Sequence, residues 1–312
     1  MLSGYWQKVH LLIAVFCRSF FLFMHDFSAR AYRFKTERTG SIMKLFRPKA
    51  TKERKGRKVF FLRTRYLAIP GALLCICALC LLTNLPSYVS ASATERQLPI
   101  YCVQRDYKVC ALSFDAAWGN EDTQTLIDIF DKYKVKVTFF VVGDWVDKYP
   151  ESVKALTDAG HEVMCHSNTH EHFNTLSADQ IVADINACSD KIEKVTGVRP
   201  TLFRPPFGEY DDHVVSTVRG MGMEVIQWDV DSLDWKDYDA PTITQRVTTK
   251  VGPGSIVLFH NAALHTPEAL PGILEYLLQE GYEIVPISQL ILPGEYNTDF
   301  TIDHTGRQCP SE

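Results

Sequence analysis

The sequence predicts an α/β fold, a distorted parallel (β/α) barrel of about seven strands. Two observations lead to this prediction. From Cys102 onward, short apolar runs alternate with longer stretches in which apolar residues recur about every 3.6 positions. Most of the longer stretches end at a glycine, as helix C-termini do. A hydrophobic content of 46% beside 22% charged residues is sufficient for a packed core.

Seven apolar runs are the expected strands: 109–114, 135–142, 161–165, 201–204, 223–228, 254–259 and 282–287. Six amphipathic stretches are the expected helices: 123–133, 151–160, 177–197, 213–222, 242–252 and 267–281. Ser177 and Gln180 have the spacing of a capping box. No internal repeat is evident, so one domain is expected over residues 108–292, with a C-terminal tail over 293–312.

A basic segment, residues 1–65, and an apolar run precede this domain. Ten Lys or Arg and one Glu lie between residues 44 and 65. Residues 66–85 (Tyr66 to Leu85) are twenty residues without a charge, the length that crosses a bilayer. The basic flank predicts a transmembrane anchor that leaves the N-terminus in the cytoplasm and the domain outside the cell. A buried core helix is the alternative, which the basic flank and Pro70 disfavour.

Processing of the N-terminal region is left open by the sequence. Residues 86–107 form the expected linker, and the small residues Ala91 and Ala93 would permit cleavage after Ala93, which would release a secreted domain. The segment from Met43 has the composition of an ordinary basic n-region, so we expect Met43 to be the initiator in place of Met1.

The charge and the cysteine content of the chain argue against some classes of function. Residues 66–312 carry a net charge of −17, which argues against nucleic-acid binding by the domain. Cys102 and Cys309 bracket the domain, and a disulfide between them is conceivable. However, five cysteines without a C-x-x-C pair predict neither a disulfide framework nor a zinc knuckle. No protein partner is predicted.

Polar side chains stand at the ends of five expected strands: Asp115, His166, Arg204, Asp229 and His260. Because the C-terminal ends of parallel strands share one face of a barrel, we expect an active site there. His166 and His170 are four residues apart, which would place both rings on one side of a helical turn. The spacing alone is also typical of surface helices, whereas the strand ends favour a site. His172 is out of phase with both.

These residue types suit hydrolysis of an amide or ester. Two histidine nitrogens and an oxygen ligand are typical of zinc or a similar divalent ion with an open position for water. Such an ion lowers the pKa of its water and polarises a carbonyl. Asp115 could accept the proton of the water, His260 could protonate the leaving amine, and Arg204 could keep Asp115 ionised.

Five segments in the order SFDAAWG, HSNTH, RPPFG, DSLDW and IVLFH resemble the five motifs of the NodB-like polysaccharide deacetylases, carbohydrate esterase family four. The resemblance covers about residues 108–292 and is strongest to the membrane-anchored, sporulation-type branch of Gram-positive bacteria. It implies removal of N-acetyl groups from N-acetylglucosamine or N-acetylmuramic acid units of a peptidoglycan-like cell-wall polysaccharide. It also implies a divalent metal, zinc or in its place cobalt or manganese.

The resemblance assigns roles by position. His166 and His170 would be the metal ligands, Asp115 the base and His260 the acid. Arg204 would orient Asp115.

Five further positions take roles in the same way. Asp234 would tune the acid, and Trp235 and Leu258 would shape the acetyl pocket. Phe207 and Gly208 belong to the loop that lines the substrate groove.

One position departs from the family pattern. The first motif normally has two adjacent aspartates, the base and a metal ligand, and the second is Ala116 here. Asp115 could bind the metal and leave the base role to another group. Alternatively, Glu121 or Asp122 could supply the ligand, or the metal could bind weakly to two histidines and water.

The leading interpretation is a membrane-anchored, metal-dependent N-deacetylase that faces the cell wall. A glycan-binding or scaffolding protein on a decayed deacetylase barrel is the alternative, and Ala116 is its only support. An esterase acting on O-acetyl groups is a third reading, because only the leaving atom differs.

Overall fold

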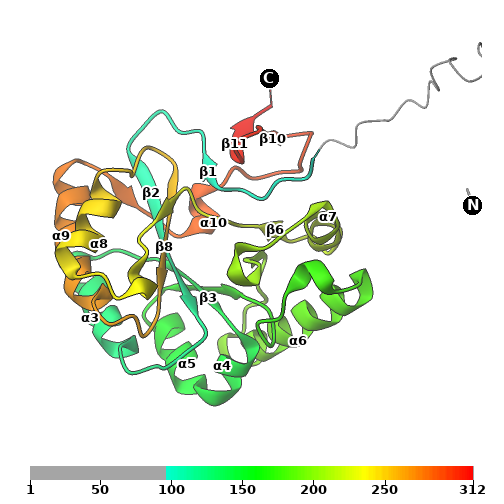
Figure 1. The fold of residues 1–312 in the computed structure, drawn as a ribbon, viewed down its shortest axis with the longest axis horizontal. Helices are drawn as coiled ribbons and strands as arrows, with labels where there is room; N and C mark the ends of the chain where they lie inside the picture. Colours follow the sequence, from blue (N-terminus) through cyan, green and yellow to red (C-terminus); the bar gives the residue numbers. More distant parts are fainter. Residues whose placement is uncertain (1–95, 312) are drawn as a thin grey trace, which may run out of the picture. The chain divides into compact units, whose positions relative to one another are not determined.

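The computed structural model describes residues 96–311 as a curled sheet with helices around it (Figure 1). Eleven strands form one sheet in the order β10-β11-β1-β8-β2-β3-β4-β5-β6, with β7 beside β8 and β9 beside β2. The seven strands expected from the sequence are all present: β2 (Val109–Ala116), β3 (Thr138–Val141), β4 (Glu162–Cys165), β5 (Leu202–Phe203), β6 (Glu224–Val225), β8 (Ser255–His260) and β9 (Glu283–Ile284). The ladders among them are parallel, as predicted.

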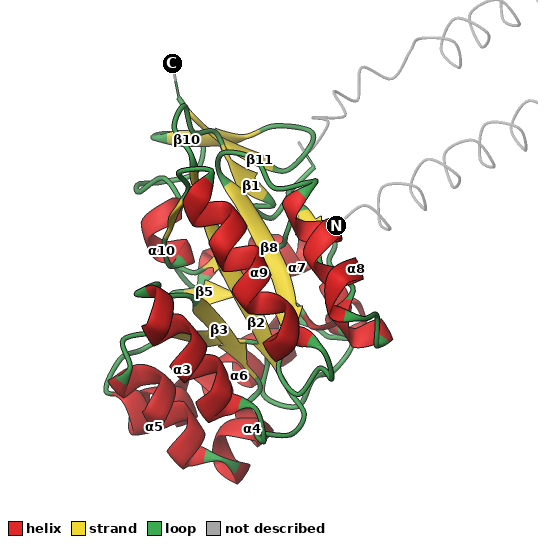
Figure 2. Ribbon diagram, turned by 90° about the vertical axis from the view of Figure 1, so that its left-hand side faces the viewer, coloured by secondary structure: helices red, strands yellow, loops and turns green. Residues whose placement is uncertain are grey.

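The six expected helices are also present: α3 (Thr123–Tyr133), α5 (Pro150–Asp158), α6 (Ala178–Thr196), α7 (Asp212–Gly220), α8 (Ala240–Thr248) and α9 (Thr266–Gln279). The capping box of Ser177 and Gln180 begins α6 as predicted. Two short helices, α4 (Gly143–Lys148) and α10 (Ile287–Leu290), were not expected, because so few residues show no helical period. Helix α9 packs between α8 and α3, and α6 packs against α5 and α7 (Figures 1 and 2).

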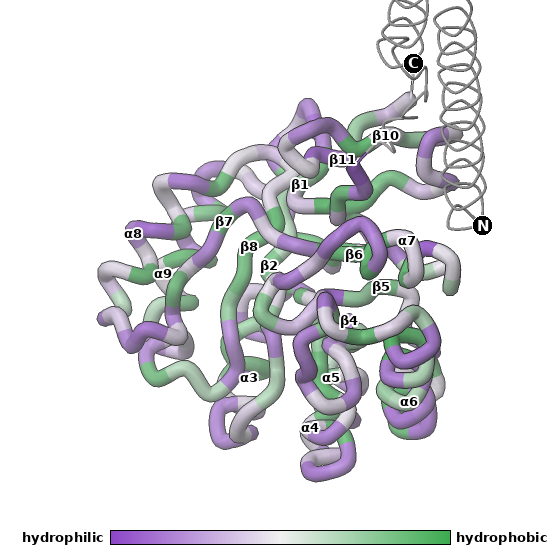
Figure 3. Tube along the Cα trace, turned by 45° about the vertical axis from the view of Figure 1, so that its right-hand side comes forward, coloured by the Kyte–Doolittle hydropathy of each residue, from purple (hydrophilic) through white to green (hydrophobic). Residues whose placement is uncertain are grey.

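The alternation of side chains along β2 separates two environments. Cys110, Leu112 and Phe114 belong to the apolar core between the sheet and the helices. Val109 and Ala111 face the other side, where they join a smaller apolar cluster with residues of α10 and β10. Figure 3 shows the hydrophobic colouring along the central strands. The last two residues of β2 that face this second side, Ser113 and Asp115, are polar. The C-terminal end of β2 therefore presents polar side chains on this face.

The barrel is not closed by neighbouring strands. In the described part of the chain, no ladder joins β6 to β7 (Val230–Asp231). The N-terminal segment occupies the gap at one end instead: Ile100 bridges to Ile226, and β1 (Cys102–Val103) pairs with the start of β8. The fold is therefore a curled α/β half-barrel, more open than the sequence suggested.

Three strands lie in segments that were expected to be linker and tail. β1 pairs with β11 (Arg307–Pro310), which pairs with β10 (Phe300–Ile302). Figure 2 shows these strands together at one end of β8. The parallel register places Cys102 opposite Arg307, two residues from Cys309, and both cysteines are free thiols. The disulfide considered between them does not form.

The expected transmembrane segment, residues 66–85, lies outside the described residues. Within residues 96–311, no helix has the length and apolar character needed to cross a membrane.

Phe114 lies at the centre of an aromatic cluster in the core. Its ring stacks on those of Phe139 and Phe259, with centroids 5.1 Å apart in each pair, and meets the Phe130 ring edge-on at 5.5 Å. Phe114→Ala is expected to lower the free energy of unfolding by about 3–5 kcal/mol, because it removes a fully buried ring and leaves a cavity. Denaturant unfolding would measure this loss. Tyr276→Ala, at an exposed ring on α9, is the control and should change stability by about 0.5 kcal/mol or less. Equal losses in both variants would contradict this account of the core.

Candidate active site

A buried ion pair occupies the inner face at the C-terminal ends of β2 and β5. Arg204, which follows β5 and is fully buried, donates from Nη1 to Oδ1 of Asp115 at 2.7 Å. Its Nη2 donates to Ser113 Oγ at 2.9 Å and to the Gln227 carbonyl at 3.2 Å. Burial raises the pKa of Asp115, but the charge and hydrogen bond of Arg204, together with the nearby His166 and His260, outweigh this effect, and the net pKa is below the ordinary value. Asp115 is therefore an anion at neutral pH.

His166 is oriented by the same arginine residue. Its Nδ1 lies 2.7 Å from the Arg204 carbonyl oxygen, so Nδ1 carries the hydrogen and the lone pair resides on Nε2. Nε2 lies 3.5 Å from Asp115 Oδ2, the carboxylate oxygen that Arg204 leaves free. Burial lowers the pKa of His166, which keeps the ring neutral. A neutral imidazole with a fixed tautomer and a directed lone pair is the state that binds a metal ion.

His170 reaches the same place through a loop and not through a helical turn, so the helical reading of the pair was wrong. Ser167 and His170 both have left-handed backbones, with φ of 71° and 61°. The Ser167 hydroxyl accepts a hydrogen bond from the His170 backbone N–H at 2.9 Å, which closes a tight turn. The two imidazole rings end 5.1 Å apart. Burial, together with the nearby His166, lowers the pKa of His170 to about 4, so this ring is also neutral at pH 7.

The site has two arms. The first is Asp115 with Arg204 and His166, and the second is His260 with Asp234. In the β2–β8 register His260 is the partner of Asp115, so the two side chains lie on one face of neighbouring strands. Asp234 Oδ1 lies 2.8 Å from His260 Nδ1, and Oδ2 accepts hydrogen bonds from the His260 N–H and the Thr266 hydroxyl. Burial lowers the pKa of His260, but the hydrogen bond and charge of Asp234 oppose it, and the net pKa is raised.

Asp229 does not join the other strand-end residues. Its carboxylate accepts hydrogen bonds from the Ser255 hydroxyl and the Ile256 N–H, both at 2.8 Å, at the N-terminal end of β8. The reason is that β6 ends at Val225 and a new strand, β7, starts at Val230, so Asp229 precedes a strand and does not end one.

The four residues expected to contact substrate lie around these two arms. Phe207 and Trp235 are exposed, at 56% and 55%, whereas Leu258 is buried on β8, where it pairs with Ser113. Gly208 has φ of +68°, and a Cβ at this position would lie 2.8 Å from the Trp228 ring. Both the conformation and the close approach require glycine.

Four supporting residues were missed from the sequence: Ser113, Gln227, Asn261 and Thr266. Asn261 accepts from the Ala117 N–H at 3.2 Å and donates to the Gly119 carbonyl, which joins the loops after β2 and β8. Gln227 donates to the Gly208 carbonyl at 3.0 Å. Asn261 and Thr266 stand in the same stretch as His260, HNAALHT, and this proximity was the available signal.

Trp145, Trp118 and His265 differ in burial. Trp145 is a core residue that donates to the Gly119 carbonyl, whereas Trp118 is 68% exposed with its ring 6.5 Å from His170. His265 lies 3.4 Å from Glu268 at the start of α9, as a surface histidine.

The donor set fits a divalent metal in part. His166 and His170 are neutral, close together and oriented, but Ala116 is a buried apolar residue in the core between sheet and helices. Asp122 is engaged elsewhere, because it accepts from the Ala262 N–H at 2.8 Å. Among residues 96–311, no group of three His, Cys, Asp or Glu side chains is assembled as a ready metal site. The described side chains therefore offer two imidazoles, His166 and His170, as candidate ligands.

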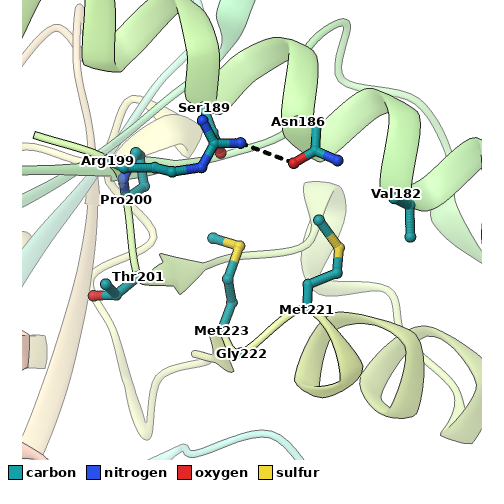
Figure 4. Close-up of a pocket in the computed structure, with 9 residues that line it drawn as sticks. All are labelled: Val182, Asn186, Ser189, Arg199, Pro200, Thr201, Met221, Gly222 and Met223. Carbon is teal, nitrogen blue, oxygen red and sulfur yellow. Dashed lines mark hydrogen bonds between the residues drawn. The ribbon is translucent and has the colours of Figure 1, made fainter.

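A pocket of about 430 Å³ lies at the other end of the sheet (Figure 4). It is lined by Ser189 of α6 and by residues that precede β5 and β6, among them Arg199, Met221 and Met223. The Arg199 guanidinium is already paired with Asp190 and two other side chains of α6. We assign no catalytic role to this pocket, because the polar strand-end residues are on the opposite side.

The chain is similar to known proteins in sequence and in structure. A family profile described as polysaccharide deacetylase matches residues 103–226. The peptidoglycan-N-acetylmuramic acid deacetylase PdaC of Bacillus subtilis is 39% identical over 188 residues, which are 60% of this chain and 40% of PdaC. An uncharacterised 30.6 kDa protein of Geobacillus stearothermophilus is 30% identical, and the match covers 61% of this chain and 73% of that protein.

Among solved structures, a CE4 family pseudoenzyme of Bacillus anthracis is 36% identical with a TM-score of 0.60. The match covers 62% of this chain and 69% of that one. A mutant of this pseudoenzyme is described as having restored enzymatic activity.

The raised pKa of His260 can be tested in the metal-free protein by an NMR titration of the imidazole. Asp234→Asn is expected to lower the pKa of His260, because it removes the charge that most strongly opposes the effect of burial. In the wild type, stability from this pair is full below about pH 6.5 and is lost as the pH rises through the raised pKa. Asp237→Asn, an exposed position in the same loop, is the control. An unchanged pKa in Asp234→Asn would refute the assigned interaction.

Proposed function

The chain belongs to the polysaccharide deacetylases of carbohydrate esterase family four, and from this premise we propose that it hydrolyses N-acetyl groups of a cell-wall polysaccharide. The units attacked would be N-acetylglucosamine or N-acetylmuramic acid in a peptidoglycan-like chain. The observation that carries the proposal is the pairing of Asp115 with His260 across neighbouring strands, each held by its own charged partner. Amide hydrolysis requires a base on one side of the carbonyl and an acid on the other.

Asp115 is suited to be the base. Arg204 occupies Oδ1 and leaves Oδ2 to accept a proton from an attacking water. The arginine also keeps the carboxylate ionised, and because Arg204 is itself fixed by Ser113 and Gln227, Asp115 has little freedom to reorient. A base held in place before the substrate arrives avoids reorganisation during the reaction.

His260 is suited to be the acid. Its Nδ1 is engaged by Asp234, so Nε2 is the nitrogen that can deliver a proton to the leaving amine of the sugar. The raised pKa maintains a protonated fraction near neutral pH. Asp234 therefore acts on the reaction through His260, as the carboxylate of a catalytic triad does.

His166 and His170 would hold a divalent ion, with zinc, cobalt or manganese as candidates. Such an ion, when bound, supplies Lewis-acid polarisation of the acetyl carbonyl and makes water more acidic. The chain would contribute two neutral imidazoles as ligands, whereas the Ala116 side chain has no atom that could bind the ion. With two protein ligands, the site is expected to bind the metal ion more weakly than a site with three.

The substrate and location are proposed from different observations. PdaC is described as a deacetylase of N-acetylmuramic acid in peptidoglycan, which supports a wall glycan here, although the chain covers only 40% of PdaC. Residues 66–85 would anchor the protein in the membrane with the domain on the outer side, unless cleavage after Ala93 releases it. This placement would bring the site to the cell wall.

A second function is supported by one observation. The Bacillus anthracis relative is described as a pseudoenzyme of the same family. A chain with Ala116 in place of a ligand could bind glycan without turnover. Against this, each carboxylate oxygen of Asp115 and Asp234 has a specific neighbour: Arg204 and His166 for Asp115, and His260 and Thr266 for Asp234.

Acetate release from N-acetylglucosamine oligomers and peptidoglycan tests the proposal, with the full chain in detergent after chelation and after addition of zinc, cobalt or manganese. We expect release that a metal restores and that falls by about 100-fold or more in His166→Ala and Asp115→Asn. His304→Ala, at an exposed histidine distant in sequence, is the control. An O-acetylated substrate run in parallel distinguishes esterase activity.

The opposite result would be no release with any ion from a protein that still binds the glycan. This outcome would favour the non-catalytic glycan-binding function.

A further inference from the structure

His172 is the third histidine of the HSNTHEH segment, and neither arm of the site uses it. It lies in the loop between β4 and α6, two residues after His170. Its side chain is 58% exposed, which excludes a role in the core. Nevertheless, the ring is fixed by two contacts, and both lead to the loop that follows β5.

The first contact is a stack on Phe207. The two rings are 4.4 Å apart and nearly parallel, with an interplanar angle of 15°. The second contact is to Glu209, whose Oε2 lies 2.8 Å from His172 Nδ1. His172 therefore joins the loop after β4 to both ends of the short segment 207–209. Phe207 also meets His170 edge-on, with the ring centroids 4.5 Å apart and an interplanar angle of 72°, so Phe207 contacts both histidines.

The backbone under Phe207 is held in an unusual conformation. Phe207 has φ of 59°, a left-handed conformation that a bulky residue rarely adopts. The next residue, Gly208, is held by two contacts: Gln227 donates a hydrogen bond to its carbonyl, and the Trp228 ring lies against it. Conformational strain of this kind is retained where surrounding contacts impose it, and it is concentrated at functional sites. Here it directs an aromatic ring that is still 56% exposed toward the metal-ligand candidates.

We propose that His172 is a positioning residue of the substrate groove, which holds Phe207 beside His170 so that a sugar ring of an N-acetylhexosamine chain can pack on the exposed part of Phe207. The inference rests on the proposed function and identifies what fixes one wall of the groove. Exposed aromatic rings pack on apolar faces, and a ring that is already immobilised loses less entropy when the ligand binds. Glu209 orients His172 from the far side.

His172 acts by its ring and not as a metal ligand. Its Nδ1 is engaged by Glu209, and its ring plane lies against Phe207. A stack survives replacement by another flat ring, whereas metal ligation does not. This difference separates the two roles in an experiment.

The primary measurement is the dissociation constant for an N-acetylglucosamine pentamer, by calorimetry with the chelated full chain, so that no turnover is required. His172→Ala is expected to raise it by about two- to tenfold, the scale of one aromatic contact. His172→Phe keeps the stack and should stay within about twofold of wild type. Where turnover is measurable, the loss in His172→Ala should appear in KM, with kcat within about twofold.

His213→Ala, at an exposed histidine of α7, is the matched control and should bind as wild type does. Circular dichroism verifies that each variant is folded. Three results would overturn the inference: wild-type affinity in His172→Ala, equal losses in the Phe and Ala variants, or a lower zinc affinity in His172→Ala. Failure of wild type to bind the pentamer would also overturn it. Absence of acetate release alongside the expected binding pattern would refute the catalytic proposal alone.

Discussion

Arg204 is a fully buried cation, and its hydrogen bonds determine how the site is arranged. The guanidinium pairs with the negatively charged carboxylate of Asp115, while the backbone carbonyl of the same residue fixes the tautomer of His166. One residue thus orients both the proposed base and a proposed metal ligand. A charge this deep in the protein requires such pairing, because an unpaired buried ion costs several kcal/mol. Phe140, whose ring lies 4.2 Å from the guanidinium carbon, adds a cation–π contact on the inner face.

The half-barrel brings the second arm to the first. β2 and β8 are parallel neighbours, and their register sets Asp115 beside His260. The Asp234 carboxylate then connects the loop after β7 to the start of α9 through Thr266. The proposed acid and base are therefore placed by strands, which are rigid, while Phe207 and Trp235 are placed by loops, where substrate preference can vary.

The sequence predicted the strands and the strand-end residues because parallel strands bury both faces and their ends share one edge. It failed where local geometry overrides a pattern. His166 and His170 have helical spacing, but left-handed Ser167 and His170 bring the rings together from a loop. Asp229 looked like a strand end because the break between β6 and β7 carries no glycine or proline. The strand β1 was missed because two residues carry no periodicity, and only the long-range pairing of Cys102 defines them.

Ala116 distinguishes this chain from the family pattern, and we infer that its site has two metal ligands where three are usual. Zinc titration of wild type and Ala116→Asp by calorimetry tests this claim most directly. We predict that the added carboxylate raises zinc affinity by about 10- to 100-fold, with His166 and His170 still required. Unchanged affinity in a folded Ala116→Asp protein would contradict the claim, because it would mean that another group already supplies the third ligand.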